Sequence, residues 1–459
     1  MVFRIKLFIF YIIFLSLSLV FYSNVKSQTL EEALVAAYKN NPILKSQRAS
    51  LRATDEQIPQ AMSGFRPSLT LSTSASLNHV QGKSTGSTDT KPRSMSLSLS
   101  QPIYRGGRTT NTLRQAEANI IAARAGINQS EQNVLQSVIR IYMDVLRDKA
   151  VVQLNQSNEE RLQKQAQATR DRFDVGEVTK TDVAQAEARL SRVVSERVAS
   201  EGLLGVSKAT FIRITGIEAN SLSRVPPISF LPESKADAIE LALEKNPAII
   251  QSLSIQKAAL ASIEIAKSSM RPTITINGSI TSSYDSSAFN YLSETAQVTT
   301  SLSFPIYQGG VLSSQVRQAK QVASQRTIEL EQQKQIVIEG VTSAWTALQS
   351  ASDRIRSNII QLEAAEIALE GVIQEAEVGA RTTLDVLDAE QELLDAQVSL
   401  VRAERDEFVA AFDLRVAIGT LSAEELGLPT TLYDPNKNYP KYSGNLQIPE
   451  SELIKFIKN

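Results

Sequence analysis

The chain has no cysteine and a single histidine among its 459 residues. Without thiols, neither disulfides nor cysteine chemistry can contribute to its stability or activity. His79 lies in a stretch rich in Gly, Ser and Thr, so we expect a solvated loop residue rather than a metal ligand. The formal net charge of −1 provides no basic surface for nucleic acid. We therefore expect no enzymatic activity, no cofactor, no metal site and no nucleic-acid partner.

A long apolar run is present only near the N-terminus. Two basic residues precede the apolar stretch 7–22, and Val25 and Ser27 place small residues before a cut ahead of Gln28. This layout predicts a secretory signal peptide over 1–27, with a retained N-terminal anchor as the alternative. No later segment approaches the roughly 20 apolar residues of a spanning helix, so we expect an exported chain that is periplasmic, secreted or a β-barrel.

The rest of the chain contains one unit twice. Its motifs recur 203 or 205 residues later: Asn41-Pro42 as Asn246-Pro247, Arg66-Pro67 as Arg271-Pro272, Pro102-Ile103-Tyr104-Arg105-Gly106-Gly107 as Pro305-Ile306-Tyr307-Gln308-Gly309-Gly310, Val175-Gly176 as Val378-Gly379, and Gly216 as Gly419. The offset changes between Pro67 and Pro102, so a loop there differs in length. The pattern predicts a duplication, divided into repeat 1 over 28–216, a linker over 217–235, repeat 2 over 236–420 and a polar tail over 421–459.

Each repeat opens with a helical segment, 29–62 or 236–270, followed by two stretches in which apolar and hydroxyl residues alternate. These stretches, about 67–78 and 93–102, then about 272–282 and 296–305, predict strands. Alternation over about ten residues is typical of transmembrane barrel strands, although a half-buried sheet of a soluble domain has it too. Four strands cannot close a barrel, and open edges in lipid are costly. If these strands span a membrane, several chains must pool them.

Two long helical stretches complete each repeat. Between residues 108 and 173 there is no proline and only Gly126, which allows about 100 Å of helix at 1.5 Å per residue. Apolar residues step along it by three, four or seven: Leu113, Ala116, Ile120, Ala123, Ile127, Val134, Val138, Ile141, Val145 and Val152. This seam predicts antiparallel helical hairpins. An ordinary coiled coil explains the helices equally well but leaves the strands unexplained.

The hairpin tips are expected at about 174–181 and 377–384. Glycine suits the end of a helix because it accepts a left-handed backbone, and Gly176 and Gly379 stand at these places. Each tip also has a threonine three residues before an aspartate, Thr179 before Asp182 and Thr382 before Asp385, which is a start signal for the next helix. On these residues alone, both aspartates cap helices.

The tips resemble those of the TolC-type outer-membrane efflux family. The stretch Glu377-Val378-Gly379-Ala380-Arg381-Thr382-Thr383-Leu384-Asp385-Val386-Leu387-Asp388-Ala389 is similar to the family's second tip. Val175-Gly176, followed by Thr181-Asp182-Val183, is similar to the first. The family's strand-to-helix junctions resemble the two Pro-Ile-Tyr-x-Gly-Gly segments, which contain Pro102, Gly106 and Gly107, and Pro305, Gly309 and Gly310. The resemblance covers about 29–419.

The resemblance implies a mostly α fold with a small β part. In a homotrimer, each chain would contribute four strands to a shared twelve-stranded transmembrane β-barrel, and long hairpins to an α-barrel tunnel in the periplasm. The function implied is the outer-membrane exit duct of a tripartite export system. Secreted proteins or toxic small molecules would arrive from an inner-membrane ABC or proton-driven transporter, helped by a periplasmic adaptor. The alternative is a secreted or periplasmic structural coiled-coil protein.

The resemblance also implies roles for residues at the tips. Arg381 would bond to Thr181 and Asp182 as a gate, and Asp385 and Asp388 would form two acidic rings in the lumen. A three-residue spacing does put both carboxylates on one helix face. Ala376 stands where the family often has a tyrosine bonded to the gate aspartate, so more of the gate rests on Arg381. The adaptor would dock on Val175, Gly176, Glu177, Val378, Gly379 and Ala380.

The linker and the tail are expected outside the helical barrel. The linker 217–235 contains three prolines, and the tail from Leu428 is polar, has four prolines and shows no apolar period. We therefore expect the tail to be loosely ordered.

Overall fold

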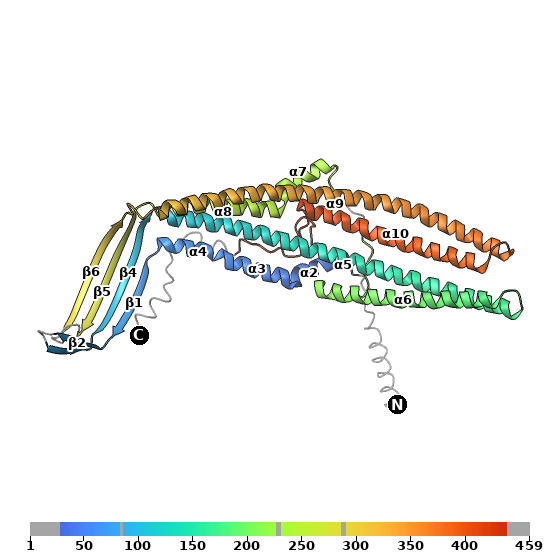
Figure 1. The fold of residues 1–459 in the computed structure, drawn as a ribbon, viewed down its shortest axis with the longest axis horizontal. Helices are drawn as coiled ribbons and strands as arrows, with labels where there is room; N and C mark the ends of the chain where they lie inside the picture. Colours follow the sequence, from blue (N-terminus) through green and yellow to red (C-terminus); the bar gives the residue numbers. More distant parts are fainter. Residues whose placement is uncertain (1–27, 83–85, 226–230, 286–290, 438–459) are drawn as a thin grey trace, which may run out of the picture.

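The computed structural model describes residues 28–82, 86–225, 231–285 and 291–437. The predicted signal peptide, 1–27, lies outside these residues. The molecule is elongated, with a β-sheet at one end and the tips of two long helical hairpins at the other (Figure 1). It is mostly helical, as predicted.

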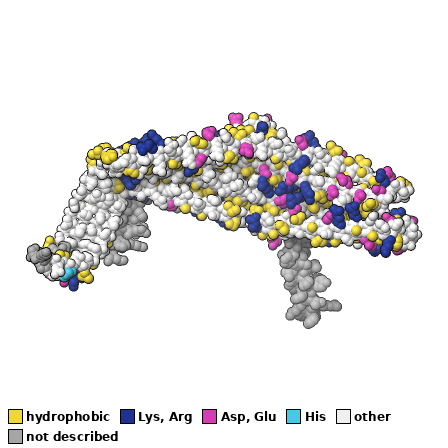
Figure 2. Space-filling view, in the orientation of Figure 1, with side chains coloured by type: hydrophobic (Ala, Val, Ile, Leu, Met, Phe, Trp, Pro, Cys, Tyr) yellow, Lys and Arg dark blue, Asp and Glu magenta, His cyan; other side chains and the backbone are white. Residues whose placement is uncertain are grey.

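The four predicted strands form one antiparallel sheet in the order β1-β4-β5-β6. They are β1 (Ser68–Ala75), β4 (Arg93–Arg105), β5 (Thr273–Tyr284) and β6 (Leu292–Ser303). Ser68 pairs with Ser100, and its counterpart Thr273 pairs with Ser303, so both repeats use the same register. The sheet face visible in Figure 2 is almost free of hydrophobic and charged side chains. Apolar side chains of the strands are exposed, including Leu69, Leu71, Leu97, Ile280 and Val298.

The segment 78–93, which the sequence led us to expect as a loop, contains a hairpin of β2 (Asn78–Gly82) and β3 (Gly86–Thr90). The prediction missed it because its short strands lack apolar alternation. His79 is exposed, as expected, but it lies on β2, where its Nδ1 is 2.6 Å from Oδ1 of Asp89 on β3. The cross-strand register brings the two side chains opposite each other.

The long helices have equal lengths in both halves (Figure 1). Helices α5 (Arg108–Asp174) and α9 (Val311–Glu377) each have 67 residues, and α6 (Lys180–Thr215) and α10 (Thr383–Ile418) each have 36. The pairs α5–α6 and α9–α10 form the predicted hairpins. None of the described helices has both the length and the apolar composition that a membrane span requires.

The opening helix of each repeat is broken, where the sequence led us to expect continuous segments. The first repeat has α2 (Leu30–Asn40), α3 (Pro42–Asp55), α4 (Gln57–Met62) and the 3-10 turn η1 (Ser63–Phe65), and the second has α7 (Lys235–Lys245) and α8 (Pro247–Ser268). Asn41 and Asn246 cap α3 and α8, whose first residue is proline. Proline suits that position because its missing N–H has no helical partner there.

The same asparagines tie the repeats' helices together. Nδ2 of Asn41 donates to the Ile214 carbonyl at 3.1 Å, and Nδ2 of Asn246 donates to the Ala417 carbonyl at 2.8 Å. Both carbonyls lie in the last turn of a hairpin helix, where carbonyl groups lack a helical donor. The Asn-Pro motif therefore serves as both helix cap and interhelix bridge.

The main hydrophobic core surrounds the middle of α5. Tyr142, Leu135 and Ile139 are completely buried there against Phe211 and residues of α2. Part of the C-terminal tail packs into the same core: Leu421 is fully buried, Leu428 is 8% exposed, and the Tyr433 N–H donates to the Tyr38 hydroxyl at 2.9 Å. The expectation of a loose tail was therefore wrong for 428–437, because Leu428 and Tyr433 cover apolar surface. The remaining tail lies outside the described residues.

Candidate functional site

The two hairpin tips end their first helices in the same way. Gly176 and Gly379 have φ of 82° and 78°, in the left-handed region that favours glycine. Glu177 N–H donates to the Arg172 carbonyl at 2.9 Å, and Ala380 N–H to the Glu375 carbonyl at 2.9 Å. A Cβ on either glycine would meet nothing within 4 Å, so the backbone angle, rather than crowding, calls for glycine.

The second helix of each tip begins with a capping box, as the Thr-x-x-Asp spacing predicted. Thr179 Oγ1 accepts from the Asp182 N–H at 3.3 Å, while the Thr179 N–H donates to Asp182 Oδ2 at 2.8 Å. Thr382 and Asp385 repeat this geometry. The hydrogen bonds from threonine lower the pKa of both carboxyl groups below its ordinary value. Both aspartates therefore stay ionised at neutral pH.

Arg381, which the resemblance implies as a gate residue, pairs within its own tip in the single chain. Its Nε donates to Glu375 Oε2 at 2.7 Å, and this bond raises the pKa of the guanidinium. The Asp182 carboxylate accepts from Thr179. One chain alone therefore does not bring Arg381 to Thr181 or Asp182, and the gate stays a prediction about neighbouring copies.

Asp388, expected in a lumen ring, contacts the other hairpin. Its Oδ1 accepts from Nη2 of Arg189 on α6 at 2.5 Å. Sequence reasoning missed Arg189, although Arg189 lies seven residues after Asp182 and hence on nearly the same face of α6. Asp385 and Asp388 share a helix but have different partners.

A buried carboxyl group lies slightly farther from the tips. Glu390 of α10 is 7% exposed, and burial raises the pKa of its carboxyl, opposed by the positive charge of Arg161 on α5. Leu387 of α10 packs beside it against Leu162 and Val193 of the first hairpin. No sequence pattern marked this contact, because it joins residues more than 190 positions apart.

The glycines of the two strand-to-helix junctions have similar φ angles but different surroundings. Gly107 and Gly310 cap α5 and α9 with φ of 84° and 81°. A Cβ on Gly106 would lie 2.6 Å from the Ser268 carbonyl oxygen, whereas one on Gly309 would meet nothing within 4 Å. At the second junction, Ile306 and Tyr307 are 90% and 85% exposed. The first junction is covered by α8, and the second is open.

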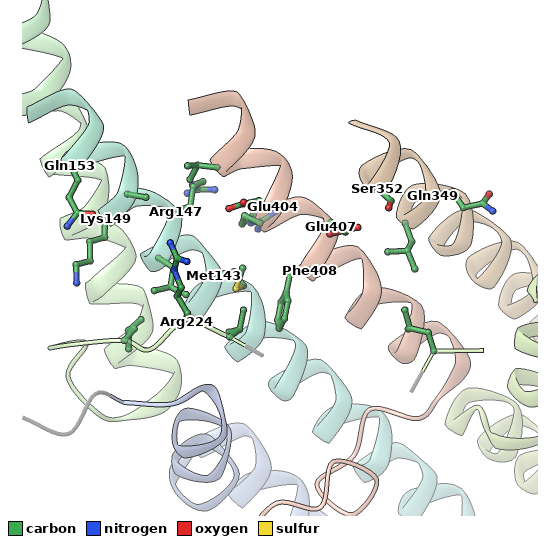
Figure 3. A pocket seen from close by; sticks show the side chains of 18 residues that line it. Met143, Arg147, Lys149, Gln153, Arg224, Gln349, Ser352, Glu404, Glu407 and Phe408 are labelled. Atoms are coloured by element: carbon green, nitrogen blue, oxygen red, sulfur yellow. The ribbon is translucent and has the colours of Figure 1, made fainter. Parts of the chain in front are cut away.

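A groove of about 1030 Å³ lies at mid-length, between α5, α9, α10 and the linker (Figure 3). Charged side chains of both signs line it, including Arg147, Lys149, Arg224, Glu404 and Glu407. Arg405, another lining residue, donates to Asp144 at 2.9 Å and so joins the two hairpins beside the groove. Among the described residues, no cluster of His, Cys, Asp or Glu could hold a metal ion.

The chain thus combines a four-stranded sheet with open edges and two long helical hairpins with capped tips. The chain belongs to the outer membrane efflux protein family, whose model matches residues 33–216 and 238–420. Each match lies within one of the two sequence repeats. Members of this family are channel proteins.

Named relatives cover nearly the whole chain. The outer membrane efflux protein BepC of Brucella suis is 35% identical over 415 residues, 90% of each chain. TolC of Vibrio cholerae is 27% identical over 420 residues, 88% of this chain and 93% of TolC. The CmeC outer membrane channel of Campylobacter jejuni shares the fold, with a TM-score of 0.76 at 18% identity over 91% of this chain and 90% of that one. The protein is an outer-membrane exit duct for export.

Proposed function

We propose that three copies of the chain close into a duct with a twelve-stranded barrel and a periplasmic tunnel of hairpins. The observation that carries this proposal is that the two lateral sides of the chain have strand edges and apolar helix surface that no other described part of the chain covers. Within the described part of the chain, β1 and β6 each have one strand neighbour and one free edge. In lipid such edges must pair. Pairing β6 with β1 of the next copy satisfies both.

The helices support the same association. Helix α5 is buried along much of its length, whereas α9, of equal length, buries only Ala323, Leu330, Val337, Val341, Ala351 and Ala365. Its exposed residues include Ile328, Ile360 and Ile367, and α6 on the opposite side of the chain exposes Val198, Leu203 and Val206. A head-to-tail contact between different surfaces closes into a ring when the rotation fits.

The repeat predicts the strand register between copies. Within the chain, Ser98 of β4 pairs with Ser279 of β5. β6 is the counterpart of β4 at an offset of 203 residues, so Ser301 corresponds to Ser98. β1 is the counterpart of β5 at an offset of 205, so Ser74 corresponds to Ser279. The same pairing between copies therefore places Ser301 opposite Ser74 of the next copy. The intrachain pairs β1–β4 and β5–β6 already obey this mapping.

This register can be tested because the chain has no native cysteine. The double variant Ser74→Cys/Ser301→Cys should form disulfide-linked trimers in the outer membrane, since paired Cβ atoms lie within about 5.5 Å. The control Ser74→Cys/Leu302→Cys should not crosslink, because neighbouring residues on a strand face opposite sides. Crosslinking of the control but not of the first variant would refute the register.

We further propose that the tips gate the duct and dock a periplasmic adaptor. Arg381 would bond to Thr181 and Asp182 of the next copy, giving up Glu375. The variant Arg381→Ser should raise single-channel conductance in planar bilayers, and unchanged conductance would remove Arg381 from the gate. Its control is Arg356→Ser, at an exposed arginine that pairs with Asp353 along α9.

The adaptor also identifies the cargo class. A single cysteine at Glu177 or Ala380, crosslinked in living cells, should capture an adaptor protein at the tips. Capture of an ABC transporter's adaptor would indicate protein secretion, and capture of a proton-driven pump's adaptor would indicate efflux of small toxic molecules. Capture of no adaptor from either position would contradict docking at the tips.

A further inference from the structure

An ion pair joins the two hairpins close to their tips. Arg189 lies in the third turn of α6 and Asp388 in the second turn of α10. Their Nη2 and Oδ1 atoms are 2.5 Å apart, with 28% of the arginine side chain and 57% of the aspartate side chain exposed. The contact therefore spans from the first hairpin to the second.

Packing beside the ion pair holds these side chains in place. Leu190, next to Arg189, packs against a buried cluster that contains Leu387, next to Asp388. The same cluster includes Leu162 of α5 and Val193 of α6. Burial of these neighbours fixes how α6 and α10 are rotated, so Arg189 and Asp388 face each other.

Asp385 has a different electrostatic environment. Its carboxylate accepts from the N–H and hydroxyl of Thr382, which carry no charge. The nearby Arg381 attracts it but donates its own hydrogen bond to Glu375. Among the residues that the structure describes, the carboxylate of Asp385 therefore keeps its negative charge without an ion-pair partner at hydrogen-bond distance.

We propose that Arg189 determines the charge selectivity of the duct's narrow end by cancelling the charge of Asp388, which leaves Asp385 as the ring that attracts cations. This inference rests on the proposed trimer, in which each residue occurs three times around the lumen. Two opposite charges 2.5 Å apart act as a dipole on an ion several ångströms away, and such a field falls off faster than that of a free charge. Dissolved salt weakens it further.

The test is block of the open channel by a trivalent cation, hexaamminecobalt(III), added on the side of the tips. Full-length protein is studied in planar bilayers. The variant Asp385→Asn should weaken block more than about tenfold, and Asp388→Asn less than about threefold, because only the first removes an uncancelled charge. Arg189→Gln should tighten block at least about threefold, since it frees Asp388. Combining Arg189→Gln with Asp388→Asn should restore the original block.

The direction of the change in cation block distinguishes an effect on charge selectivity from an effect on gate opening. Arg189→Gln and Asp388→Asn both remove the ion pair between the hairpins. If that ion pair only held the hairpins together, both variants would change conductance and cation block in the same direction. The control Glu363→Gln removes an exposed carboxylate elsewhere on α9 and should leave block unchanged. Equal weakening by Asp385→Asn and Asp388→Asn, with no tightening by Arg189→Gln, overturns the proposal. Absence of any conducting trimer instead rejects the proposed duct.

Discussion

The two glycines that end the hairpin helices occupy equivalent positions but should respond differently to substitution. Gly216 ends α6 with φ of 76°, and Gly419 ends α10 with φ of 98°. A Cβ on Gly216 would come no nearer than 3.7 Å, to Asn40 Cβ. A Cβ on Gly419 would lie 2.7 Å from Asn246 Cα and 3.0 Å from the Lys245 carbonyl oxygen. Those are backbone atoms of the α7–α8 junction and cannot move freely.

The free energies follow from these distances. Gly216→Ala should cost about 1–2 kcal/mol, the strain of a left-handed alanine. Gly419→Ala adds overpacking of about 1–3 kcal/mol, for a total of about 2–5 kcal/mol. With an unfolding entropy of about 2.1 cal/mol/K per residue, a chain of this length loses roughly 1 °C of melting temperature per kcal/mol. The expected losses are therefore about 1–2 °C for Gly216→Ala and about 2–5 °C for Gly419→Ala.

The assay compares apparent melting temperatures and unfolding rates of the purified variants at one scan rate, since many large proteins unfold irreversibly and their apparent melting temperature then depends on the scan rate. If the α7–α8 junction forms late in folding, much of the difference should appear as faster unfolding of Gly419→Ala. Equal destabilisation of the two variants would refute the reasoning, because it would mean that the junction moves aside without cost.

Three further predictions concern other contacts. Tyr142→Phe should lower stability by about 1–3 kcal/mol in thermal unfolding, since the buried hydroxyl shares its proton between the Gln28 and Ser223 carbonyls. Burial raises the pKa of Tyr142 to about 12, so the difference between the spectroscopic titrations of the wild-type chain and Tyr142→Phe should show no ionisation below pH 10. Asn246→Ala should lower the free energy of unfolding by about 1–3 kcal/mol, because it removes the cap of α8 and the hydrogen bond to the Ala417 carbonyl. A much smaller loss in Asn41→Ala would contradict the equivalence of the two repeats. The pKa of Asp385 is lower in the folded tip than its unfolded value of 3.8. The ionised carboxylate therefore stabilises the tip fully at any pH above 3.8, and this stabilisation is lost as the pH falls through the lower pKa of the folded state. Hydrogen exchange at the start of α10 should therefore be unchanged from pH 7 to pH 5 and accelerate, relative to the intrinsic rate, only below about pH 4.

Local patterns in the sequence were enough to predict the elements and their ends. Strict alternation located the four strands, and the run without proline located α5 to within a residue of its end. The Thr-x-x-Asp spacing predicted both capping boxes, because a cap depends on residues three positions apart. The two Asn-Pro motifs were visible as repeats, but their effect of breaking the opening helices was missed.

Contacts between distant residues were decided only by the tertiary structure. Asp385 and Asp388 look alike in the sequence, yet only Asp388 meets Arg189, 199 positions away, because the packing of Leu387 against Leu162 and Val193 sets the rotation of the helices. Likewise, Gly106 and Gly309 stand in matching motifs, and only the fold shows that α8 covers the first. The sequence by itself determined helices, strands, caps and the family, since these depend on neighbouring residues and repeated motifs. The structure decided which charges are paired and which surfaces are free, since these depend on how the hairpins pack.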